Sequence, residues 1–573
     1  MTSLPPPTAL SSVQQQRLRL ALDRAGESWD PVVQMLRVPF SSPGYHTTLQ
    51  GGWVHPTREN FIYAVSLLDT GNEAEQERGL ALLDRLLDLQ DTDPESKTYG
   101  IWSWFYEESL QQMSPPDWNW ADFCGAQLLE TALTHTHPYP LQERIKSGII
   151  HAARSIERRN VGPGYTNIAI MGSFVALAAA ETYDLPDLFA FATAKFRRFH
   201  AYTMEQGGFT EYNSPTYTLV ALDELGRLIR YVRDPEARAL AGELYRRGWK
   251  EVADHFHAPT RQWAGPQSRA YQTLLPQRIY GFLHRATGGR FGQDDDQPEI
   301  AEHRLVHTCP ADMESRFLSL VTAREHRQTF FREMDGRPDT VGTTHLAPAF
   351  TLGTVNAGDL WAQRRALLAY WGTAAKPSSL RLRFLHDGRD FSAAHLFSAQ
   401  RGGDAVCGVS FAVDGFDTHI FFDPIKHGTI RARDLRLRFE FGGDAVDRLP
   451  QAPGHLSEPW IFNDERVSIS IVMAHAAWGD LKGHWQRGGA EGHAWLDVSL
   501  YEGPEREFRL ADLSEAACAF AIRILPGAAK PLIPKLSAEG GRLTVTTDNL
   551  GVTFAAAPLP LTKLFASFSS SVG

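Results

Sequence analysis

The spacing of hydrophobic residues changes about halfway along this chain, and this change limits the fold more than any other feature. In the first half, apolar residues recur every three or four positions, as in residues 79–90 (GLALLDRLLDLQ), which predicts amphipathic helices. Later, apolar and polar residues alternate, as in residues 435–441 (LRLRFEF), which predicts antiparallel strands. The sequence therefore predicts an α+β, multidomain protein, with a helical domain over residues 1–311 and an antiparallel β-sheet domain over residues 312–573.

The length of the chain and one apolar segment refine this division. With 573 residues, the chain exceeds what one hydrophobic core usually serves. Residues 168–181 (IAIMGSFVALAAAE) are apolar on nearly every side, which is typical of a helix surrounded by other helices. We therefore expect concentric helical layers in the first domain.

The net charge and the hydropathy pattern exclude several classes of protein. A formal net charge of −10 argues against a chain that coats nucleic acid or anionic lipid. No segment approaches the roughly 20 apolar residues of a membrane span, and the first residues lack the apolar core of a signal peptide. We expect no nucleic-acid or membrane partner and a cytoplasmic location, unless a trimmed start conceals a periplasmic or secreted protein.

The cysteines do not form a metal-binding pattern. They lie far apart, at positions 124, 309, 407 and 518, without a C-x-x-C pair or a Cys/His cluster at zinc spacing. Structural zinc is therefore not expected from the sequence.

A tryptophan-rich segment, residues 99–123 (YGIWSWFYEESLQQMSPPDWNWADF), is unusual for a connection between helices. Sugar rings stack on aromatic faces while nearby amides and carboxylates bind their hydroxyls, so this segment is a candidate carbohydrate-binding surface. The competing interpretation is that the aromatic residues plug the end of the helical domain as part of its core. The candidate substrate-binding residues are Trp102, Trp104, Trp118, Asn119 and Trp120.

Two further segments place polar side chains at predicted helix starts. Asn167 lies where the apolar helix begins, and the free N–H groups of a helix start favour a bound carboxylate; the alternative is that Thr166 or Asn167 is only an N-cap. Residues 207–217 (GGFTEYNSPTY) precede another predicted helix, where Ser214 and Pro215 suit the cap and the first turn. The candidate functional residues that this leaves are Glu211, Tyr212, Asn213 and Tyr217.

A fourth segment, residues 263–281 (WAGPQSRAYQTLLPQRIYG), adds Arg269 and Tyr271. An arginine is the preferred partner of a carboxylate, although a structural ion pair is an equal alternative. A cation beside a phenol, or the first turn of a helix, favours the ionised form of that phenol. We therefore expect the pKa of a functional tyrosine here to be lowered.

In this order, the tryptophan-rich segment, the asparagine that opens an apolar helix and the GG-x-x-E…SP-x-Y turn resemble the polysaccharide lyases of the heparinase II/III-like and chondroitin AC-type groups. The resemblance implies an incomplete (α/α) toroid followed by antiparallel β-sandwich domains. It also implies β-elimination at a 4-linked uronic acid without a required cofactor or catalytic metal. A structural divalent cation in the β domain, which some relatives carry, stays open.

The resemblance also implies roles for individual residues. Tyr217 matches the tyrosine of the S-P-x-Y motif, which acts as proton donor or base, and Asn167 matches the asparagine that binds the uronate carboxyl. Arg269 matches the arginine beside the catalytic tyrosine of the chondroitin-type group. Tyr212 stands where that group has a histidine, and His345 is at the position from which heparinase-like members draw theirs. The base therefore stays open between Tyr217, Tyr212 and His345.

One segment of the second half also resembles these lyases. Residues 353–372 (GTVNAGDLWAQRRALLAYWG) are similar to the opening of their β-sandwich. We expect five of its residues to pack between the two predicted domains rather than to reach the substrate: Asn356, Trp361, Gln363, Arg364 and Arg365.

The resemblance therefore implies a lyase that acts on an anionic poly- or oligosaccharide, and the sequence indicates neither the glycan nor an oligomeric state. Neutralising the uronate carboxylate would make the C5 proton removable, and a tyrosine would transfer the protons. The nearest alternative is a glycoside hydrolase on an (α/α) toroid that uses paired carboxylates such as Glu107 and Asp117. A carbohydrate-binding or scaffold protein without turnover is the third.

Overall fold

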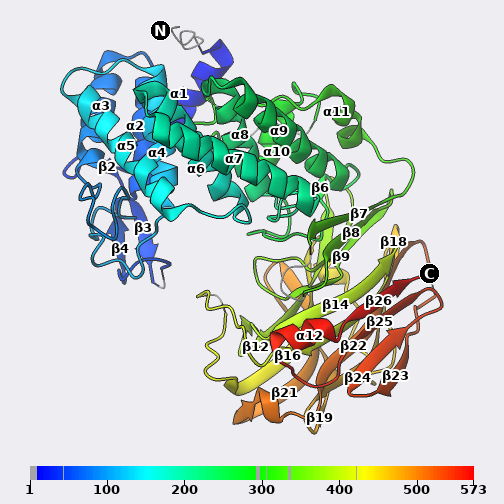
Figure 1. Ribbon diagram of the computed structural model, residues 1–573. Coiled ribbons are helices and arrows are strands. Elements are labelled where there is room, and N and C mark those ends of the chain that lie inside the picture. The colour runs from blue at the N-terminus through cyan, green and yellow to red at the C-terminus, as the bar shows by residue number, and fades with distance from the viewer. Residues whose placement is uncertain are drawn as a thin grey trace. The chain divides into compact units, whose positions relative to one another are not determined.

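The computed structural model is a mixed α+β fold (Figure 1), as the change in hydrophobic spacing predicts. It describes residues 10–42, 44–291, 294, 297–304, 306–332, 337–420, 422–528 and 530–573. The chain divides into two compact units. Unit 1 comprises Met1–Thr203, Leu219–Gly248 and Gln277–Cys309; unit 2 comprises Met204–Thr218, Trp249–Pro276 and Pro310–Gly573.

Two segments from the predicted helical domain thus belong to the unit that contains most of the strands. They are Met204–Thr218 and Trp249–Pro276, and they include the loop GGFTEYNSPTY. The main strand-bearing part of unit 2 begins at Pro310. As a domain boundary, the division between residues 311 and 312 stays a prediction.

Helices form most of the first part of the chain, with short strand pairs near its start. Their bounds are α1 (Ser12–Gly26), β1 (Trp29–Asp30), β2 (Met35–Leu36), β3 (Val38–Ser41), β4 (Gly51–Val54), α2 (Thr57–Leu68), α3 (Glu73–Leu87), α4 (Trp120–Thr134), α5 (Leu141–Arg159), α6 (Thr166–Tyr183), α7 (Pro186–Gln206), α8 (Tyr217–Tyr231), α9 (Pro235–His255) and α10 (Gln277–Ala286).

Helices α2 to α6 pack as two layers. Helix α2 contacts α4, and α4 contacts α6; in the other layer α3 contacts α5. Helices α4 and α6 are buried nearly all round, as predicted for residues 168–181, whereas α5 buries a single stripe. Glycine lets α4 and α6 approach closely, because a Cβ on Gly172 would lie 2.6 Å from Asp122 Oδ1. These layers agree with the expected layering, and the toroid itself stays a prediction.

A helix that crosses a membrane needs a long apolar segment. In the part of the chain that the structure describes, no helix combines the length and the apolar character that crossing a bilayer needs.

Strands form most of unit 2. Their bounds, with those of the helices among them, are β5 (Phe256–His257), β6 (Gln262–Trp263), α11 (Ala311–Leu318), β7 (Arg324–Phe331), β8 (Thr340–Leu346), β9 (Phe350–Val355), β10 (Ala357–Asp359), β11 (Leu367–Gly372), β12 (Pro377–His386), β13 (Arg389–Asp390), β14 (Ala394–Arg401), β15 (Asp404–Phe411), β16 (Thr429–Gly443), η1 (Val446–Arg448), β17 (Trp460–Asn463), β18 (Val467–Trp478), β19 (Leu481–Lys482), β20 (His484–Ala490), β21 (His493–Arg509), η2 (Leu510–Asp512), β22 (Ala516–Pro526), β23 (Lys535–Glu539), β24 (Arg542–Thr546), β25 (Leu550–Ala555), α12 (Leu561–Ala566) and β26 (Ser569–Val572).

Strand β5 pairs with β6, and the other described strands of unit 2 build three antiparallel sheets in layers. The first sheet has the order β20-β21-β16-β12-β11-β9-β8-β7, with β13 beside β12. The second has the order β10-β14-β15-β22-β18-β17, with β19 beside β18, and the third has the order β23-β24-β25-β26. The antiparallel pairing confirms what the period of two predicted for this half.

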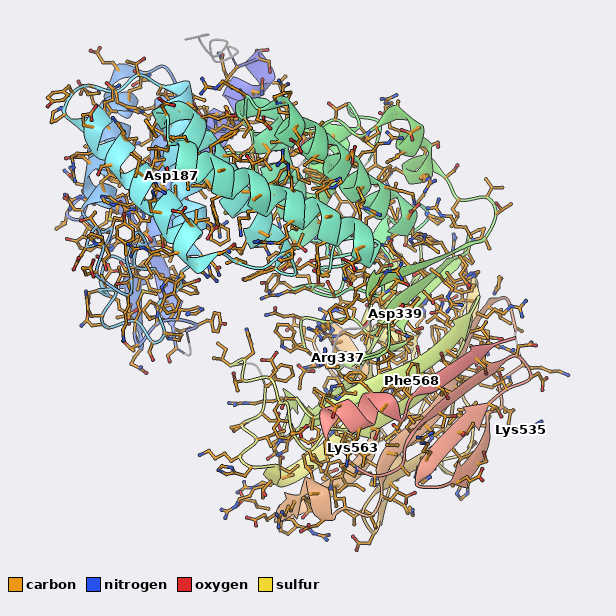
Figure 2. All side chains as sticks on the ribbon, in the orientation of Figure 1. Asp187, Arg337, Asp339, Lys535, Lys563 and Phe568 are labelled. Carbon is orange, nitrogen blue, oxygen red and sulfur yellow. The ribbon has the colours of Figure 1, made fainter. Side chains whose placement is uncertain are left out.

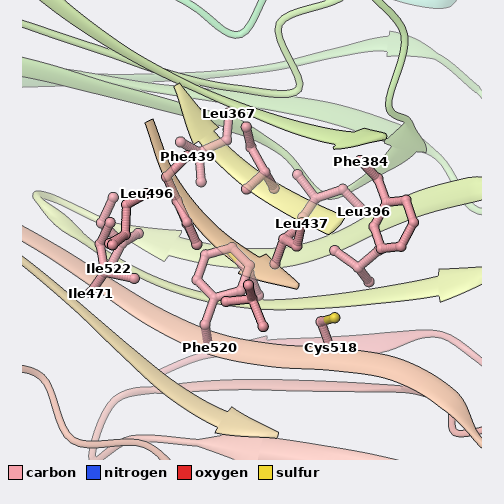
Figure 3. Packing of buried hydrophobic residues seen from close by; sticks show 14 of the residues in the cluster. Leu367, Phe384, Leu396, Leu437, Phe439, Ile471, Leu496, Cys518, Phe520 and Ile522 are labelled. Carbon is pink, nitrogen blue, oxygen red and sulfur yellow. The ribbon is translucent and has the colours of Figure 1, made fainter. Parts of the chain in front are cut away.

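The second sheet lies between the other two and buries both of its faces. Figure 3 shows Leu437 and Phe439 of the first sheet against Cys518 and Phe520 of the second. On the opposite face, alternate residues pack against the third sheet, where the Phe554 ring covers Gly408 so closely that a Cβ there would lie 2.1 Å away. Because side chains alternate along a strand, a sheet with two covered faces needs nearly continuous apolar sequence.

Replacing Phe520 tests whether this double core supports the fold. Phe520 is fully buried, so Phe520→Ala should lower the free energy of unfolding by about 3–5 kcal/mol through lost burial and the cavity left behind. Urea unfolding followed by tryptophan fluorescence measures the change. The control is Leu536→Ala on β23, where Leu536 is 38% exposed and a change within about 0.5 kcal/mol is expected. Equal effects of the two substitutions would contradict the layered core.

Candidate functional site

A buried asparagine anchors the loop GGFTEYNSPTY, residues 207–217, which we call the tyrosine loop. Asn213 has a left-handed backbone (φ 49°), which asparagine tolerates better than most residues. Its Nδ2 donates to the carbonyl oxygens of Ala264 and Pro266, both at 2.7 Å, and its Oδ1 accepts from Trp263 Nε1. Its backbone N–H donates to Glu251 Oε1 at 2.9 Å. Asn213 therefore fixes the loop, and its predicted contact with substrate stays a prediction.

The segment that receives Asn213 is itself held by strands of unit 2. Gln267 and Arg365 exchange backbone hydrogen bonds of 3.1 and 2.9 Å. Thr344 Oγ1 donates to the Gly265 carbonyl at 2.7 Å. The backbones approach so closely that a Cβ on Gly353 would lie 1.9 Å from Gly265 O, which explains the glycine at position 353.

Tyr212 is buried beneath this loop. Its hydroxyl lies 2.6 Å from His255 Nε2, and its ring stacks on Phe330 with 4.4 Å between centroids. His255 Nδ1 lies 2.7 Å from the Glu251 carbonyl. Because a carbonyl only accepts, Nδ1 carries the hydrogen and Nε2 accepts from the tyrosine. Burial raises the pKa of Tyr212 and lowers that of His255, so the pair is neutral.

Tyr217, in contrast, belongs to a cluster that reaches solvent. Its hydroxyl lies 2.7 Å from that of Tyr271, which is 52% exposed. The Arg269 guanidinium lies 4.8 Å from the centroid of the Tyr217 ring, and Arg269 Nε donates to Gln363 Oε1 at 2.9 Å. The structure therefore brings together three of the predicted residues, Tyr217, Arg269 and Tyr271.

Ser214 fixes the orientation of this cluster. Its Oγ accepts from the Tyr217 N–H at 3.1 Å, as expected of the cap of α8, and donates to the Arg269 carbonyl at 2.6 Å. One hydroxyl thus couples the start of the helix to the segment that carries the arginine.

The protonation of Tyr217 differs from the sequence-based expectation. Burial raises the pKa of Tyr217; the Arg269 charge opposes this, whereas the hydrogen bond with Tyr271 and the charge of Glu211 reinforce it. The expected lowering of this pKa is therefore wrong for the protein without substrate, because desolvation of the phenolate outweighs one cation. Tyr217 is a phenol at neutral pH, which suits a proton donor.

Aromatic residues from the strand-bearing part complete the cluster. The Arg269 guanidinium lies 5.5 Å from the Trp361 ring, which also contacts His419 edge-on at 5.0 Å and stacks with Phe422. Burial lowers the pKa of His419; the Asp417 charge opposes this shift and the Arg269 charge reinforces it. The net shift is downward, so this imidazole is neutral at neutral pH. The sequence had assigned Trp361 to packing between domains and had given no signal for His419.

His345 lies apart from Tyr212. A Cβ on Gly342 would lie 2.7 Å from the Tyr212 ring, so Gly342 and Thr344 face Tyr212. Because side chains alternate along β8, His345 projects from the opposite face, where its ring is 5.5 Å from Phe350. The structure therefore does not join His345 to the tyrosine loop, and a base role for it has no geometric support.

In unit 1, the tryptophan-rich segment separates into core and candidate surface residues. Trp102 is fully buried and its Nε1 donates to the Leu86 carbonyl at 2.9 Å, so it is a core residue. Trp104 and Trp120 stack with 4.9 Å between centroids, and Trp118 is 36% exposed. A sugar-binding role remains a prediction for these residues, with Trp102 unsuited to it by burial.

Polar residues flank this aromatic pair. Arg159 Nη1 donates to Asn119 Oδ1 at 2.6 Å. Burial raises the pKa of the nearby Asp122 carboxyl to about 7 and lowers that of Lys195 to about 8. The segment therefore combines aromatic faces with hydrogen-bonding groups.

Asn167 lies in the first turn of α6, as predicted. The cap position of this helix is Tyr165, so the alternative that Thr166 or Asn167 is the N-cap is wrong. Asn167 is 1% exposed. Its role in binding a carboxylate stays a prediction.

Metal ligation was considered for the same side chains. Among the residues that the structure describes, no group of three or more His, Cys, Asp or Glu side chains is placed to hold a metal ion.

Comparisons with known proteins give distant similarities. Residues 39–314 match the family model of a domain of unknown function (DUF8769), and a search of curated proteins finds no match. Heparinase III is similar over 97% of this chain and 94% of its own, with 9% identity and a TM-score of 0.47. Paenibacillus xanthan lyase is similar over 95% of this chain and 61% of its own, with 10% identity and a TM-score of 0.39. The endoglucanase CelQ from Clostridium thermocellum is similar over 91% of this chain and 93% of its own, with 10% identity and a TM-score of 0.23. Similarities at this level do not establish an activity, so function is inferred below from the side chains.

Substitution of Asn213 tests the anchor of the loop. In Asn213→Asp the carboxylate cannot donate to the two carbonyls and is buried against them, so unfolding should become easier by about 2–5 kcal/mol. Asn213→Gly keeps the left-handed backbone and loses only the side-chain hydrogen bonds, so its loss should be smaller. Thermal unfolding measures both. A loss in Asn213→Asp no larger than in Asn213→Gly would contradict the anchoring role of the donor.

Proposed function

We propose that this chain is a lyase that cleaves a uronate-containing glycan by β-elimination, with Tyr217 as the proton donor. The observation that carries the proposal is the hydroxyl pair of Tyr217 and Tyr271 beside the Arg269 guanidinium. A protonated phenol can donate a proton to the leaving oxygen, and a fixed positive charge can stabilise the charge that develops beside a carboxylate during elimination.

The reaction divides into two proton movements. A base removes the proton at C5, the C4–O4 bond breaks, and a double bond forms between C4 and C5. Tyr217 gives its proton to O4 of the leaving sugar, and Tyr271 returns one to Tyr217 along the 2.7 Å hydrogen bond. Tyr271, which is 52% exposed, takes a proton back from solvent, and the protonated base releases its proton to solvent. The Arg269 charge offsets the negative charge that develops next to the carboxylate.

The base in this proposal is His419. Its pKa is lowered, so its ring can accept a proton at neutral pH, and it contacts Trp361, which also contacts Arg269. Tyr212 is less suited because it is buried and its hydroxyl already donates to His255. The Arg269 charge would favour the neutral form of the His419 base before proton transfer. It would also stabilise the substrate carboxylate throughout the reaction.

The proposal also includes binding of the glycan, apart from the chemical steps. The stacked Trp104 and Trp120 offer aromatic faces to sugar rings, and Arg159 offers a cation to an acidic sugar. An anionic poly- or oligosaccharide is therefore the proposed partner. No cofactor takes part in the proposed steps.

A glycoside hydrolase is the competing proposal, and one observation favours it. The Asp122 carboxyl has a pKa raised to about 7, as a general acid would. Asp122 is only 2% exposed, however, which limits its contact with a glycosidic oxygen. The products distinguish the two, because elimination leaves a conjugated uronate that absorbs ultraviolet light and hydrolysis does not.

Removal of the Tyr217 hydroxyl tests the proton donor. On a panel of uronate polymers and oligomers, the wild type should generate ultraviolet absorbance, and Tyr217→Phe should lower kcat by about 100-fold or more with little change in KM. Tyr139→Phe is the matched control, because Tyr139 is 81% exposed and lies outside the cluster. Full activity of Tyr217→Phe would refute its role, and sugar release without absorbance would favour the hydrolase.

The dependence of kcat/KM on pH tests the base. His419 must be unprotonated, and its pKa is below 6.5, so activity should fall only as the pH drops below that value. Tyr217 must be protonated, and its pKa is above 10.0, so activity should persist from about pH 7 to about pH 9. His419→Gln should lose about 100-fold in kcat and flatten the acid limb. An unchanged acid limb in His419→Gln would assign the base elsewhere.

A further inference from the structure

A cavity of about 260 Å³ lies inside unit 2. Its walls come from the tyrosine loop, residues 266–268, strands β7 to β10, β14 and helix α12. Tyr217, Tyr271 and Arg269 are not among the described residues that line it. The cavity is therefore a different place from the proposed catalytic cluster.

Aromatic rings and two guanidinium groups line the cavity. Phe330, Phe331 and Phe565 supply the rings. Arg337, labelled in Figure 2, places its guanidinium 4.8 Å from the centroid of the Phe565 ring on α12. Arg364 contributes the second guanidinium. Flat apolar faces beside fixed cations suit a ligand that has both a carbon surface and a negative charge.

The charges on these walls leave a positive excess. Arg364 pairs with Asp359, which is the carboxylate on the wall, whereas Arg337 contributes its charge over an aromatic ring. Burial lowers the pKa of the His395 ring; the Asp359 charge opposes this shift, and the Arg337 and Arg364 charges, with smaller effects, reinforce it. An anion in the cavity is therefore electrostatically favoured.

Two buried polar atoms of the wall lack a hydrogen-bond partner among the described residues. Gln267 is 3% exposed; its Nε2 donates to the Trp263 carbonyl at 2.8 Å, which fixes the amide orientation and leaves Oε1 as an acceptor without a donor. Ser268 Oγ is also buried without a partner. A buried acceptor without a donor destabilises the empty cavity, so a ligand that carries hydroxyl groups would recover this loss.

We propose that this cavity binds a small hydroxylated carboxylate of about one sugar ring, such as a single uronic acid. At about 30 Å³ per water molecule, the cavity would hold roughly eight or nine waters, which is the space of one ring with its substituents. The carboxylate pairs with Arg337 and Arg364, a hydroxyl donates to Gln267 Oε1, and the carbon face lies against the phenylalanines.

Other ligands would interact with only some of the groups that line the cavity. Inorganic phosphate would pair with the arginines but would not cover the aromatic rings. A neutral sugar would meet Gln267 and leave the positive charge without a partner. The inference does not depend on the proposed elimination, because it uses a separate set of residues. The sugar acid can be a free monosaccharide or the end of a glycan chain.

Calorimetric titration of the full chain tests the proposal. D-glucuronate should bind with one site per chain, and D-glucose, cyclohexanecarboxylate and inorganic phosphate should each bind about tenfold more weakly or not at all. Arg337→Met and Arg364→Met should each weaken glucuronate binding about tenfold. Thr340→Trp, which fills the cavity from its wall, should abolish it. A short uronate oligomer that binds as well as glucuronate identifies the chain end as a ligand, and one that does not identifies the free sugar acid.

Two controls make the outcome decisive. Arg433→Met removes an arginine whose side chain is 71% exposed, far from the lining residues in sequence, and should leave binding unchanged. Tyr139→Phe, which replaces a tyrosine that is 81% exposed and is not among the described lining residues, should also bind glucuronate as the wild type does. Binding is measured without turnover, so a failure of the proposed lyase activity would not affect this result. Equal binding of glucose or phosphate, or an equal loss in Arg433→Met and Arg337→Met, would overturn the proposal.

Discussion

Backbone hydrogen bonding between residues 265–270 and 363–365 is the constraint on which the candidate site depends. Through it, the segment between α9 and α10 is fixed against the connection between β10 and β11, within unit 2. Asn213 ties the tyrosine loop to the same segment, and Ser214 ties the start of α8 to Arg269. The position of the Tyr217 hydroxyl is therefore set by sheet geometry as much as by the helix that carries it.

Desolvation sets the protonation of this region. It raises the pKa of Tyr217 and lowers that of His419, so an acid and a base coexist at neutral pH. The same effect makes Tyr212 and His255 a neutral pair, whose single hydrogen bond needs no ion. Opposite shifts in neighbouring groups are the usual way in which a protein carries out proton transfer in both directions at one pH.

Much of the fold followed from the sequence because it depends on local pattern. Residues 79–90 and 168–181 contribute to α3 and α6, and residues 435–441 lie in β16, as their periods predict. The layered β part and the mixed α+β class were also accessible in this way. The membership of the tyrosine loop in unit 2 was not, because it depends on hydrogen bonds between residues far apart in the sequence.

Only part of the candidate site could be predicted from the sequence, for the same reason. Tyr212 and Tyr217 carry equal signals in GGFTEYNSPTY, yet distant partners, Phe330 and His255, bury the first of them. Side chains alternate along β8, so His345 projects away from the tyrosine loop. A sequence motif does not show which face of a strand a residue occupies unless the strand register is known. His419 follows β15 without a recognisable pattern, so only its contact with Trp361 shows where it lies.

The second sheet of unit 2 belongs to two hydrophobic cores at once. Each of its inner strands, such as β15 and β22, contacts one core with its odd residues and the other with its even residues. Solvent reaches the amides of these strands only when both outer layers separate from them. The slowest hydrogen exchange in unit 2 should therefore mark these inner strands, and the two cores should open as one cooperative event rather than in sequence.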